Sequence, residues 1–272
     1  MRVARFSTGG DPTFGLVELA SDNGQHPDTV TVISGDPLAT TVQFTGERHN
    51  LADVRLLAPV IPRSKVIAVG RNYAAHAEWI GTDVPEIPMT FFKPNTAVIG
   101  PNDSIVFPSF ASKVGFEGEL AVVIGRICKE VPPERAQEVI FGYTVANDVT
   151  ARDVPTGSPL FISRSKTFDT SCPLGPWITC HLSIEEAQHL DITTSVEGGE
   201  VKRGNTGDMA LGIADIIAFV TDYLTLLPGD VILTGTPAGI DVTEAGKPVS
   251  ITIEGIGTLT NATAPHPEHA AS

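Results

Sequence analysis

The sequence predicts a β-rich α+β fold. Short runs of apolar and β-branched residues recur along most of the chain, and clusters of turn-forming residues separate them. Helical periodicity occurs only in a few scattered segments. Because strands and helices do not alternate regularly, the pattern argues against a doubly wound parallel sheet.

The first 62 residues predict a small β-rich domain. Strand patterns cover residues 3–8, 14–19 and 29–34. Turn-forming sequences follow the first and third of these runs, and no chemically reactive cluster occurs among them. Pro59 and Pro62 mark a change of pattern. We therefore expect a small N-terminal domain over residues 1–62 and a main domain over residues 63–272.

The main domain opens with strand patterns and one short helix. We expect a strand at residues 65–70 and a helix at 74–81. Further strand patterns lie at residues 88–94, 97–100, 103–108 and 116–125. Pro132 and Pro133 then begin a helix, because proline is tolerated in a first turn, and we expect it to end near Phe141 and Gly142.

The C-terminal half contains the main helix. Before it, Ser183 and Glu186 have the spacing of a capping box, and residues 193–204 have a hairpin pattern. Apolar residues then recur at helical spacing, namely Ile213, Ile216, Ile217, Val220, Tyr223, Leu224 and Leu227. Strands follow at residues 231–235 and 249–259, and the last ~10 residues form a polar flexible tail.

Composition excludes several classes of protein. The chain of 272 residues has 42% hydrophobic and 18% charged residues, as globular proteins do. A formal charge of -14 argues against a nucleic-acid or anionic-membrane partner, because both require clustered Lys and Arg. We expect a soluble cytoplasmic protein, since no long apolar run occurs and the three cysteines lack metal-ligand spacing.

The segment FEGELAVVIG, residues 116–125, carries the main chemical signal. Glu117 and Glu119 are two residues apart, so on a strand both point to one face. Two carboxylates this close repel, so either this face is open to water or a cation lies between them. An all-oxygen site suits a hard divalent ion. The alternative is an ordinary strand with one solvent-exposed face.

Six motifs in order resemble the fumarylacetoacetate hydrolase superfamily. They are GRNYAAHAEW, FFKPNTAVIGP, FEGELAVVIGR, GYTVANDVTARD, SKTFDTSCPLGPW and LTGTPAG. The resemblance covers residues 65–259, and the N-terminal part is similar to the variable appendage of many members. It implies a mixed β-sandwich roll, assembly as a homodimer or larger homo-oligomer, and a divalent ion that binds a 2-oxo or 1,3-dioxo acid.

The resemblance implies a ligand set for the metal. Glu117 and Glu119 match the family's Glu-x-Glu, and Asp148 matches the aspartate of its Asn-Asp motif. The implied ion is Mg²⁺, with Mn²⁺ or Ca²⁺ as alternatives. Three carboxylates leave about three octahedral positions for water or a chelating substrate.

The other motif positions imply catalytic and substrate-binding residues. Lys166 matches a lysine that stabilises developing negative charge, rather than a surface lysine. Arg152 matches an arginine that clamps a carboxylate, although an ion pair with Asp153 or Asp169 is an alternative. The remaining substrate-binding candidates, which could instead form plain turns or loop anchors, are Arg71, Tyr73, Gly235 and Thr236.

His76 matches the histidine that many hydrolytic members use, with a glutamate, to activate water. In those members the glutamate follows by three positions, on the same helix face, but here Trp79 holds that position. Glu78 follows His76 by two positions, a rotation of about 200° on a regular helix. Glu78 can therefore assist His76 only if the segment is irregular, which leaves the catalytic pair in doubt.

These observations lead to one first hypothesis and two alternatives. The first is hydrolysis of a C–C bond in an acylpyruvate or related β-diketo acid through its enolate. The second is oxaloacetate decarboxylation or isomerisation of a 2-hydroxy-dienoate on the same metal site. The third is a metal-binding scaffold without activity, which would not explain why Lys166, Arg152, His76 and Thr236 all match active positions.

Overall fold

The N-terminal segment forms an antiparallel meander. The computed structural model describes residues 1–20, 27–154, 162–239 and 242–268. Its first strands pair in chain order, and the fifth pairs with the other side of the first strand. Their bounds are β1 (Arg2–Ser7), β2 (Thr13–Glu18), β3 (Thr29–Ser34), β4 (Gln43–Asn50) and β5 (Arg55–Leu57), with a 3₁₀ turn, η1, at Leu51–Asp53.

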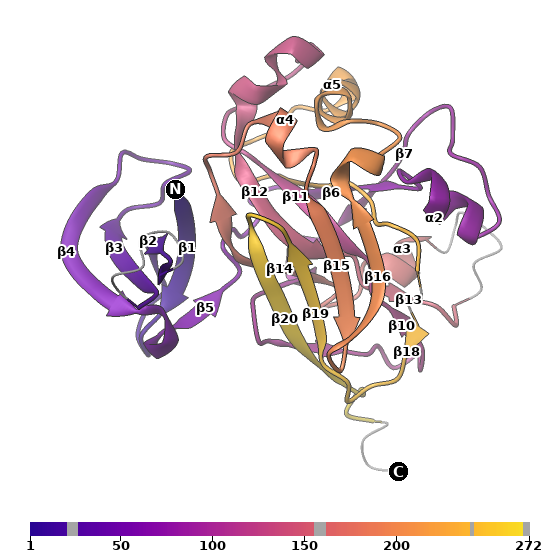
Figure 1. Ribbon diagram of the computed structural model, residues 1–272, viewed down its shortest axis with the longest axis horizontal. Coiled ribbons are helices and arrows are strands. Elements are labelled where there is room, and N and C mark those ends of the chain that lie inside the picture. Colours follow the sequence, from indigo (N-terminus) through magenta and orange to yellow (C-terminus); the bar gives the residue numbers. More distant parts are fainter. Residues whose placement is uncertain (21–26, 155–161, 240–241, 269–272) are drawn as a thin grey trace.

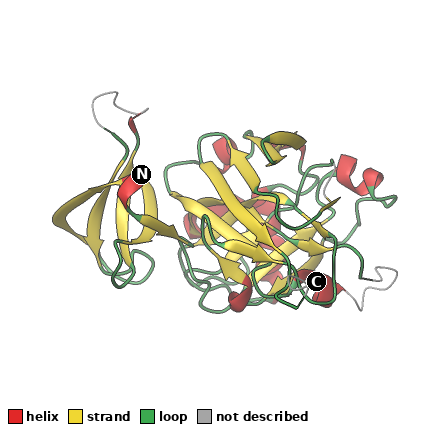
Figure 2. Ribbon diagram, turned by 90° about the horizontal axis from the view of Figure 1, so that it is seen from below, coloured by secondary structure: helices red, strands yellow, loops and turns green. Residues whose placement is uncertain are grey.

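The meander is continuous with the main sheet. Strand β1 pairs antiparallel with β14 (Cys172–Thr179), although the rest of the meander stands to one side of the molecule (Figures 1 and 2). Trp177 of β14 packs among Phe6 and other apolar residues of the meander. Its indole Nε1 donates a hydrogen bond to the carbonyl oxygen of Ile256 at 2.7 Å. The two parts therefore share both a sheet and an apolar cluster.

The main sheet continues from β14 through five further strands. Their order is β14-β12-β11-β17-β6-β7, and only the β17–β6 pair is parallel among these neighbours. The bounds are β6 (Val66–Gly70), β7 (Met89–Lys93), β11 (Gly118–Ile124), β12 (Ile140–Asn147) and β17 (Val231–Leu233). A short strand, β8 (Val98–Ile99), pairs with β14.

A second sheet packs across β11 and β12. Its order is β16-β15-β19-β20-β9, with bounds β9 (Ser104–Val106), β15 (Asp191–Val196), β16 (Gly199–Asn205), β19 (Val249–Ile253) and β20 (Gly257–Ala264). Figure 1 shows this sheet in front of β11 and β12. Leu120, Val122, Ile192 and Ile251 belong to the main apolar cluster between the sheets. The result is the mixed β-sandwich that the sequence predicts.

Smaller elements complete the fold. A three-stranded sheet has the order β13-β10-β18, with bounds β10 (Val114–Gly115), β13 (Thr150–Ala151) and β18 (Val242–Thr243). The α-helices are α2 (Ala74–Trp79), α3 (Ile162–Lys166), α4 (Ile184–Ala187) and α5 (Ile213–Tyr223), and the 3₁₀ helices are η2 (Asn95–Ala97), η3 (Pro133–Val139) and η5 (Thr206–Asp208). The capping box of Ser183 and Glu186 begins α4, as predicted.

Two expected boundaries are wrong. The segment after Pro132 is a 3₁₀ helix that ends at Val139, and Phe141 and Gly142 lie in β12. A Cβ on Gly142 would lie 2.5 Å from the carbonyl oxygen of Thr179, so this strand approaches β14 closely. At the other end, β20 continues to Ala264, so the ordered part extends into the predicted tail. Among the described residues, no helix is long and apolar enough to cross a membrane.

We predict that Trp177→Ala lowers the free energy of unfolding by about 3–5 kcal/mol, because it removes a large buried side chain and the hydrogen bond to Ile256. The chain has only one other tryptophan, Trp79, which is half exposed and is the matched control. Trp79→Ala should cost less than about 1 kcal/mol. Urea unfolding followed by far-UV circular dichroism compares the two, and equal losses would contradict the proposed role of Trp177.

Candidate active site

The cavity that contains the sequence-predicted acids is lined by both charged and apolar side chains. Its volume is about 370 Å³. The acids and the cations beside them in the lining are Glu117, Glu119, Asp148, Arg152 and Lys166, and the apolar residues are Val69, Ile80, Met89, Phe91 and Ile162. Such a cavity can hold a small anionic molecule with an apolar portion.

Strand pairing brings the three carboxylates together. Glu117 and Glu119 flank Gly118 at the start of β11, and Gly118 pairs with Asn147, the last residue of β12. Asp148 follows directly, and its backbone N–H donates to the Glu117 carbonyl oxygen at 2.9 Å. One carboxylate oxygen from each acid lies within 4.8 Å of the others. The predicted cluster therefore forms.

The two glutamates share a face, as predicted, but that face is not open to water. A Cβ on Gly118 would lie 2.6 Å from Thr194 Oγ1 in the second sheet, so the strand packs closely there and the glutamates point the other way. Glu117 is 5% exposed and Glu119 is 2% exposed. The alternative of an ordinary solvent-exposed strand face is therefore wrong.

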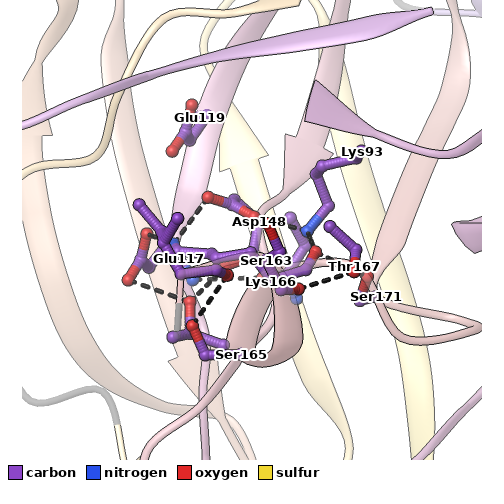
Figure 3. Close-up of polar contacts among 12 residues, drawn as sticks. Lys93, Glu117, Glu119, Asp148, Ser163, Ser165, Lys166, Thr167 and Ser171 are labelled. Atoms are coloured by element: carbon purple, nitrogen blue, oxygen red, sulfur yellow. Dashed lines mark hydrogen bonds and ion pairs between the residues drawn. The ribbon is translucent and has the colours of Figure 1, made fainter. Parts of the chain in front are cut away.

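Three cationic side chains compensate the acids. The Lys166 ammonium lies 2.6 Å from Glu117 Oε2 and 2.6 Å from Asp148 Oδ2 (Figure 3). The Arg152 guanidinium lies 2.5 Å from Glu117 Oε1. Lys93 Nζ lies 2.6 Å from Asp148 Oδ1, on the side away from Glu117. Glu119, in contrast, accepts a hydrogen bond from the backbone N–H of Gly235 at 2.6 Å.

The charges perturb the acids in opposite directions. Burial acts to raise the pKa of Glu117, but the Lys166 and Arg152 charges hold this pKa well below its usual range. Burial, together with the charges of Asp148 and Glu117, raises the pKa of Glu119 well above its usual range. The negative charge of Glu119 is therefore the least compensated of the three.

The donor set fits a hard divalent cation. All three groups are carboxylates, they are close enough to share one ion, and Glu119 is the acid that lacks a cationic partner among the described side chains. Oxygen ligands of this kind suit Mg²⁺, Mn²⁺ or Ca²⁺. The cluster is therefore a candidate metal centre.

Comparison with known proteins identifies the family. Residues 65–264 match the family described as fumarylacetoacetate (FAA) hydrolase C-terminal. Residues 1–59 match the one described as Rv2993c-like, N-terminal. The chain belongs to the fumarylacetoacetate hydrolase family. This agrees with the resemblance in the sequence and with the β-rich sandwich.

Similar members of the fumarylacetoacetate hydrolase family include isomerases, a tautomerase and hydrolases. A solved 5-carboxymethyl-2-hydroxymuconate delta-isomerase from Mycobacterium smegmatis is 46% identical, with a TM-score of 0.85 over 97% of this chain and 100% of that chain. Oxaloacetate tautomerase Fahd2a, mitochondrial, from Rattus norvegicus is 38% identical over 77% of this chain and 69% of its own. A solved Pseudomonas aeruginosa fumarylpyruvate hydrolase in complex with Mn²⁺ and pyruvate is 31% identical. Its TM-score is 0.70, and the match covers 76% of this chain and 91% of that chain.

Lys93 is a site residue that reasoning from the family motifs did not assign. It lies at the end of β7, it is 1% exposed, and its ammonium also contacts the carbonyl oxygen of Lys166. One sequence feature could have indicated that Lys93 is buried. It is a single lysine that follows four uncharged residues of a predicted strand, in FFKPNT. A lysine is almost never fully buried without an acidic partner, so a strand lysine of this kind indicates a buried acid nearby.

His76 lines the cavity, but Glu78 does not. Within the described residues, His76 Nδ1 is buried without a hydrogen-bond partner, and the His76 ring stacks on Trp79 with centroids 6.1 Å apart. Glu78 is exposed. Burial, more than any nearby charge, lowers the pKa of His76, so its imidazole is neutral near pH 7. The structure therefore gives no support to a His76–Glu78 pair.

The substrate-binding candidates occupy different positions. Arg71 lines the cavity and has a left-handed backbone with φ 59°. Gly235 and Thr236 also line it, and Thr236 Oγ1 is buried with no hydrogen-bond partner among the described groups. Tyr73 lies in the apolar cluster and does not line the cavity. Burial, together with the charges of Glu119 and Asp208, raises the pKa of Tyr73 above its usual range.

We predict that Thr236→Val raises KM about tenfold while changing the free energy of unfolding by less than about 0.5 kcal/mol, because this hydroxyl has no partner within the described structure. Thr234→Val is the matched control. The Thr234 hydroxyl donates to the Leu120 carbonyl oxygen at 2.9 Å, so its loss should destabilise the fold by about 1 kcal/mol with little effect on KM. Steady-state kinetics and urea unfolding separate the two roles, and an unchanged KM in Thr236→Val would reject a substrate contact.

Proposed function

We propose that this protein is a divalent-metal-dependent enzyme that acts on a 2-oxo acid through its enolate. The cluster of Glu117, Glu119 and Asp148 beside Lys166, in the lining of one cavity, is the observation that supports this most directly. A family that contains hydrolases, isomerases and a tautomerase is consistent with it. An inactive scaffold would not require these groups around one cavity.

The three carboxylates would hold the metal ion, and Mg²⁺ is the ion that we propose. When bound, such an ion supplies Lewis-acid chemistry, which stabilises negative charge on the 2-oxo oxygen of the substrate. The Mn²⁺ complex of the related fumarylpyruvate hydrolase is consistent with a divalent ion at this position.

The chain's own residues would orient the substrate. We assign the Thr236 hydroxyl and the Arg71 guanidinium to the substrate carboxylate, because both line the cavity and the hydroxyl lacks a partner in the described structure. Lys166 adds positive charge where the enolate forms. The side chains of Met89 and Phe91, which also line the cavity, would contact the apolar portion of the substrate.

Hydrolysis is the first candidate reaction. In an acylpyruvate, water would add to the ketone furthest from the acid, and the bond between that carbon and the enolate carbon would break. The products would be a carboxylic acid and a pyruvate-type acid. His76 would take the proton from water, as a neutral imidazole can. This reaction needs a water held against the base, and Glu78 is not placed to hold it.

Proton transfer is the second candidate reaction, and the geometry at His76 favours it. Keto–enol tautomerisation or double-bond isomerisation requires one base that moves a proton between oxygen and carbon, or between two carbons, and it requires no positioned water. His76 is a buried neutral base at the cavity, without a carboxylate partner in the described residues. We therefore propose that tautomerase or isomerase activity on a 2-oxo or 2-hydroxy-dienoic acid exceeds hydrolysis. A further candidate reaction at the same site is the decarboxylation of oxaloacetate, which needs no base.

One assay panel tests the proposed class. The purified protein with Mg²⁺ is incubated with acetylpyruvate, fumarylpyruvate and oxaloacetate, and enol absorbance, product acids and carbon dioxide are followed. We expect loss of the oxaloacetate enol to be the fastest reaction. Glu119→Gln should abolish every activity while leaving the fold intact, because glutamine has nearly the same shape, keeps an oxygen that can accept the Gly235 N–H, and lacks the charge that a metal ligand needs. His76→Ala should reduce tautomerisation and hydrolysis at least about 100-fold but spare decarboxylation. Equal losses in all reactions of His76→Ala would argue against a role in proton transfer.

The acidic limb of the pH profile should lie below pH 6.5. The reactive form of His76 is the neutral base, and a lowered pKa keeps it neutral at pH values where an ordinary histidine is protonated. Activity should therefore persist as the pH falls through about 6.5 and decline only below it. The measurement is kcat/KM against pH at saturating metal, and a midpoint above 6.5 would contradict the assignment. His76→Gln should remove this limb.

Three expectations from the sequence stay predictions. They are assembly as a homodimer or larger homo-oligomer, location in the cytoplasm, and a domain boundary near residue 63. A small-molecule substrate agrees with the family and with the size of the cavity.

A further inference from the structure

Most oxygens of the acidic cluster already accept a hydrogen bond from the protein. Both carboxylate oxygens of Glu117, both of Asp148 and one of Glu119 have described donors. The donors are Arg152, Lys166, Lys93, the Thr150 hydroxyl and the backbone N–H of Gly235. Each oxygen keeps a second lone pair, but a divalent cation that binds these acids would be repelled by the charges of Lys166, Lys93 and Arg152.

Lys166 is the donor best placed to leave. Its ammonium bridges Glu117 and Asp148, so it occupies the position between them that a shared ion would need. Its side chain is 10% exposed and borders the cavity. The Lys93 side chain, in contrast, has no exposed surface, and its ammonium is also tied to the carbonyl oxygen of Lys166.

The surroundings of Lys166 provide a second place for its charge. The ammonium already lies 5.4 Å from the ring centroid of Phe91, which lines the cavity and can stabilise a cation over its face. The backbone of Lys166 is anchored, because its carbonyl oxygen accepts hydrogen bonds from Lys93 and from Ser171 Oγ. The flexible Lys166 side chain can therefore change its rotamer while the backbone at the end of α3 stays in place.

We propose that Lys166 is a mobile counter-ion that couples metal binding to substrate binding. It bridges Glu117 and Asp148 when no metal is bound, and a divalent cation displaces it toward Phe91 and the anionic substrate. The displaced ammonium then attracts the anion, and the anion in turn keeps the ammonium away from the metal ligands. Because such coupling is reciprocal, the substrate anion strengthens metal binding by the same factor. This inference rests on the proposed metal site.

The first test measures Mg²⁺ affinity by isothermal titration calorimetry on EDTA-treated protein, with and without oxalate, a planar dianion that resembles the enolate of pyruvate. In Lys166→Met, Mg²⁺ alone should bind about ten- to hundredfold more tightly than in the wild type, because the competing charge-assisted hydrogen bonds are absent. Oxalate chelates the ion directly in both proteins. Its enhancement of Mg²⁺ affinity should nevertheless fall about tenfold in Lys166→Met.

Two further variants are the controls. Lys247→Met makes the same change in net charge at an exposed ion pair with Glu197, and its Mg²⁺ affinity should equal that of the wild type. Lys166→Arg keeps the charge, and its affinity should stay within about threefold of the wild type. In thermal unfolding without metal, Lys166→Met should melt below the wild type, since Glu117 and Asp148 lose a shared cation. Mg²⁺ should raise its Tm more than that of the wild type.

A second test uses the wild type and does not depend on whether a variant folds. Crystal structures without metal and with Mn²⁺ should show Lys166 Nζ leaving Glu117 Oε2 and Asp148 Oδ2 when the ion binds. A bridging Lys166 in the Mn²⁺ structure would overturn the inference, and so would a Lys166→Met protein that binds Mg²⁺ no more tightly than the wild type. If no protein, wild type included, bound Mg²⁺ or Mn²⁺, the proposed metal site itself would be rejected.

Discussion

The mutual repulsion of three buried carboxylates is the constraint on which this site depends. Their ligand oxygens lie within 4.8 Å of one another, away from bulk water, where like charges are costly. Lys166 and Lys93 contact Asp148, Lys166 and Arg152 contact Glu117, and Glu119 has only a backbone donor among the described groups. The cations come from separate segments, so the cluster also links β7, α3 and the end of β12. Because Glu119 is left without a cation, the same arrangement that stabilises the fold favours binding of a metal.

The sheets fix the positions of these acids. Pairing of β11 with β12 sets Asp148 beside Glu117, and close packing of Gly118 against the second sheet turns both glutamates toward the cavity. Every residue of β11 is buried, so the strand has little freedom to move. Ligands on such rigid strands hold their geometry better than ligands on loops. In contrast, His76 lies on a short helix, and Lys166 has a flexible side chain. The proposed metal ligands are thus held rigidly, and the proposed catalytic side chains have more freedom.

The sequence predicted the strands of the main sheet and the acidic cluster for identifiable reasons. Alternation placed Glu117 and Glu119 on one face, and the ordered motifs added Asp148. Other features depend on long-range contacts that local patterns do not contain. The pairing of β1 with β14 joins residues far apart in the chain, and Phe141 entered a strand because β12 has partners on both sides. Lys93 was not predicted as a site residue, because its acidic partner, Asp148, is 55 residues away in the sequence. Tyr73 belongs to a motif whose Arg71 and His76 line the cavity, but the Tyr73 ring packs into the apolar cluster, and the motif alone does not distinguish the two environments.

The position of Trp79 bears on how one acidic centre can serve different reactions. Water can add to the distal acyl carbonyl of a substrate, so that the C–C bond breaks and a pyruvate-type enolate leaves, or an enolate can be protonated at carbon. The groups that line the cavity beside the acids would decide between these outcomes. In this chain a tryptophan stands where a water-activating glutamate is expected, and its ring stacks on His76 instead of holding a water. The apolar side chains of Ile80, Met89 and Phe91 line the same cavity as His76. A base in such surroundings is better suited to move a proton between substrate atoms than to deliver hydroxide, because hydroxide would have to form without a second polar group to orient it.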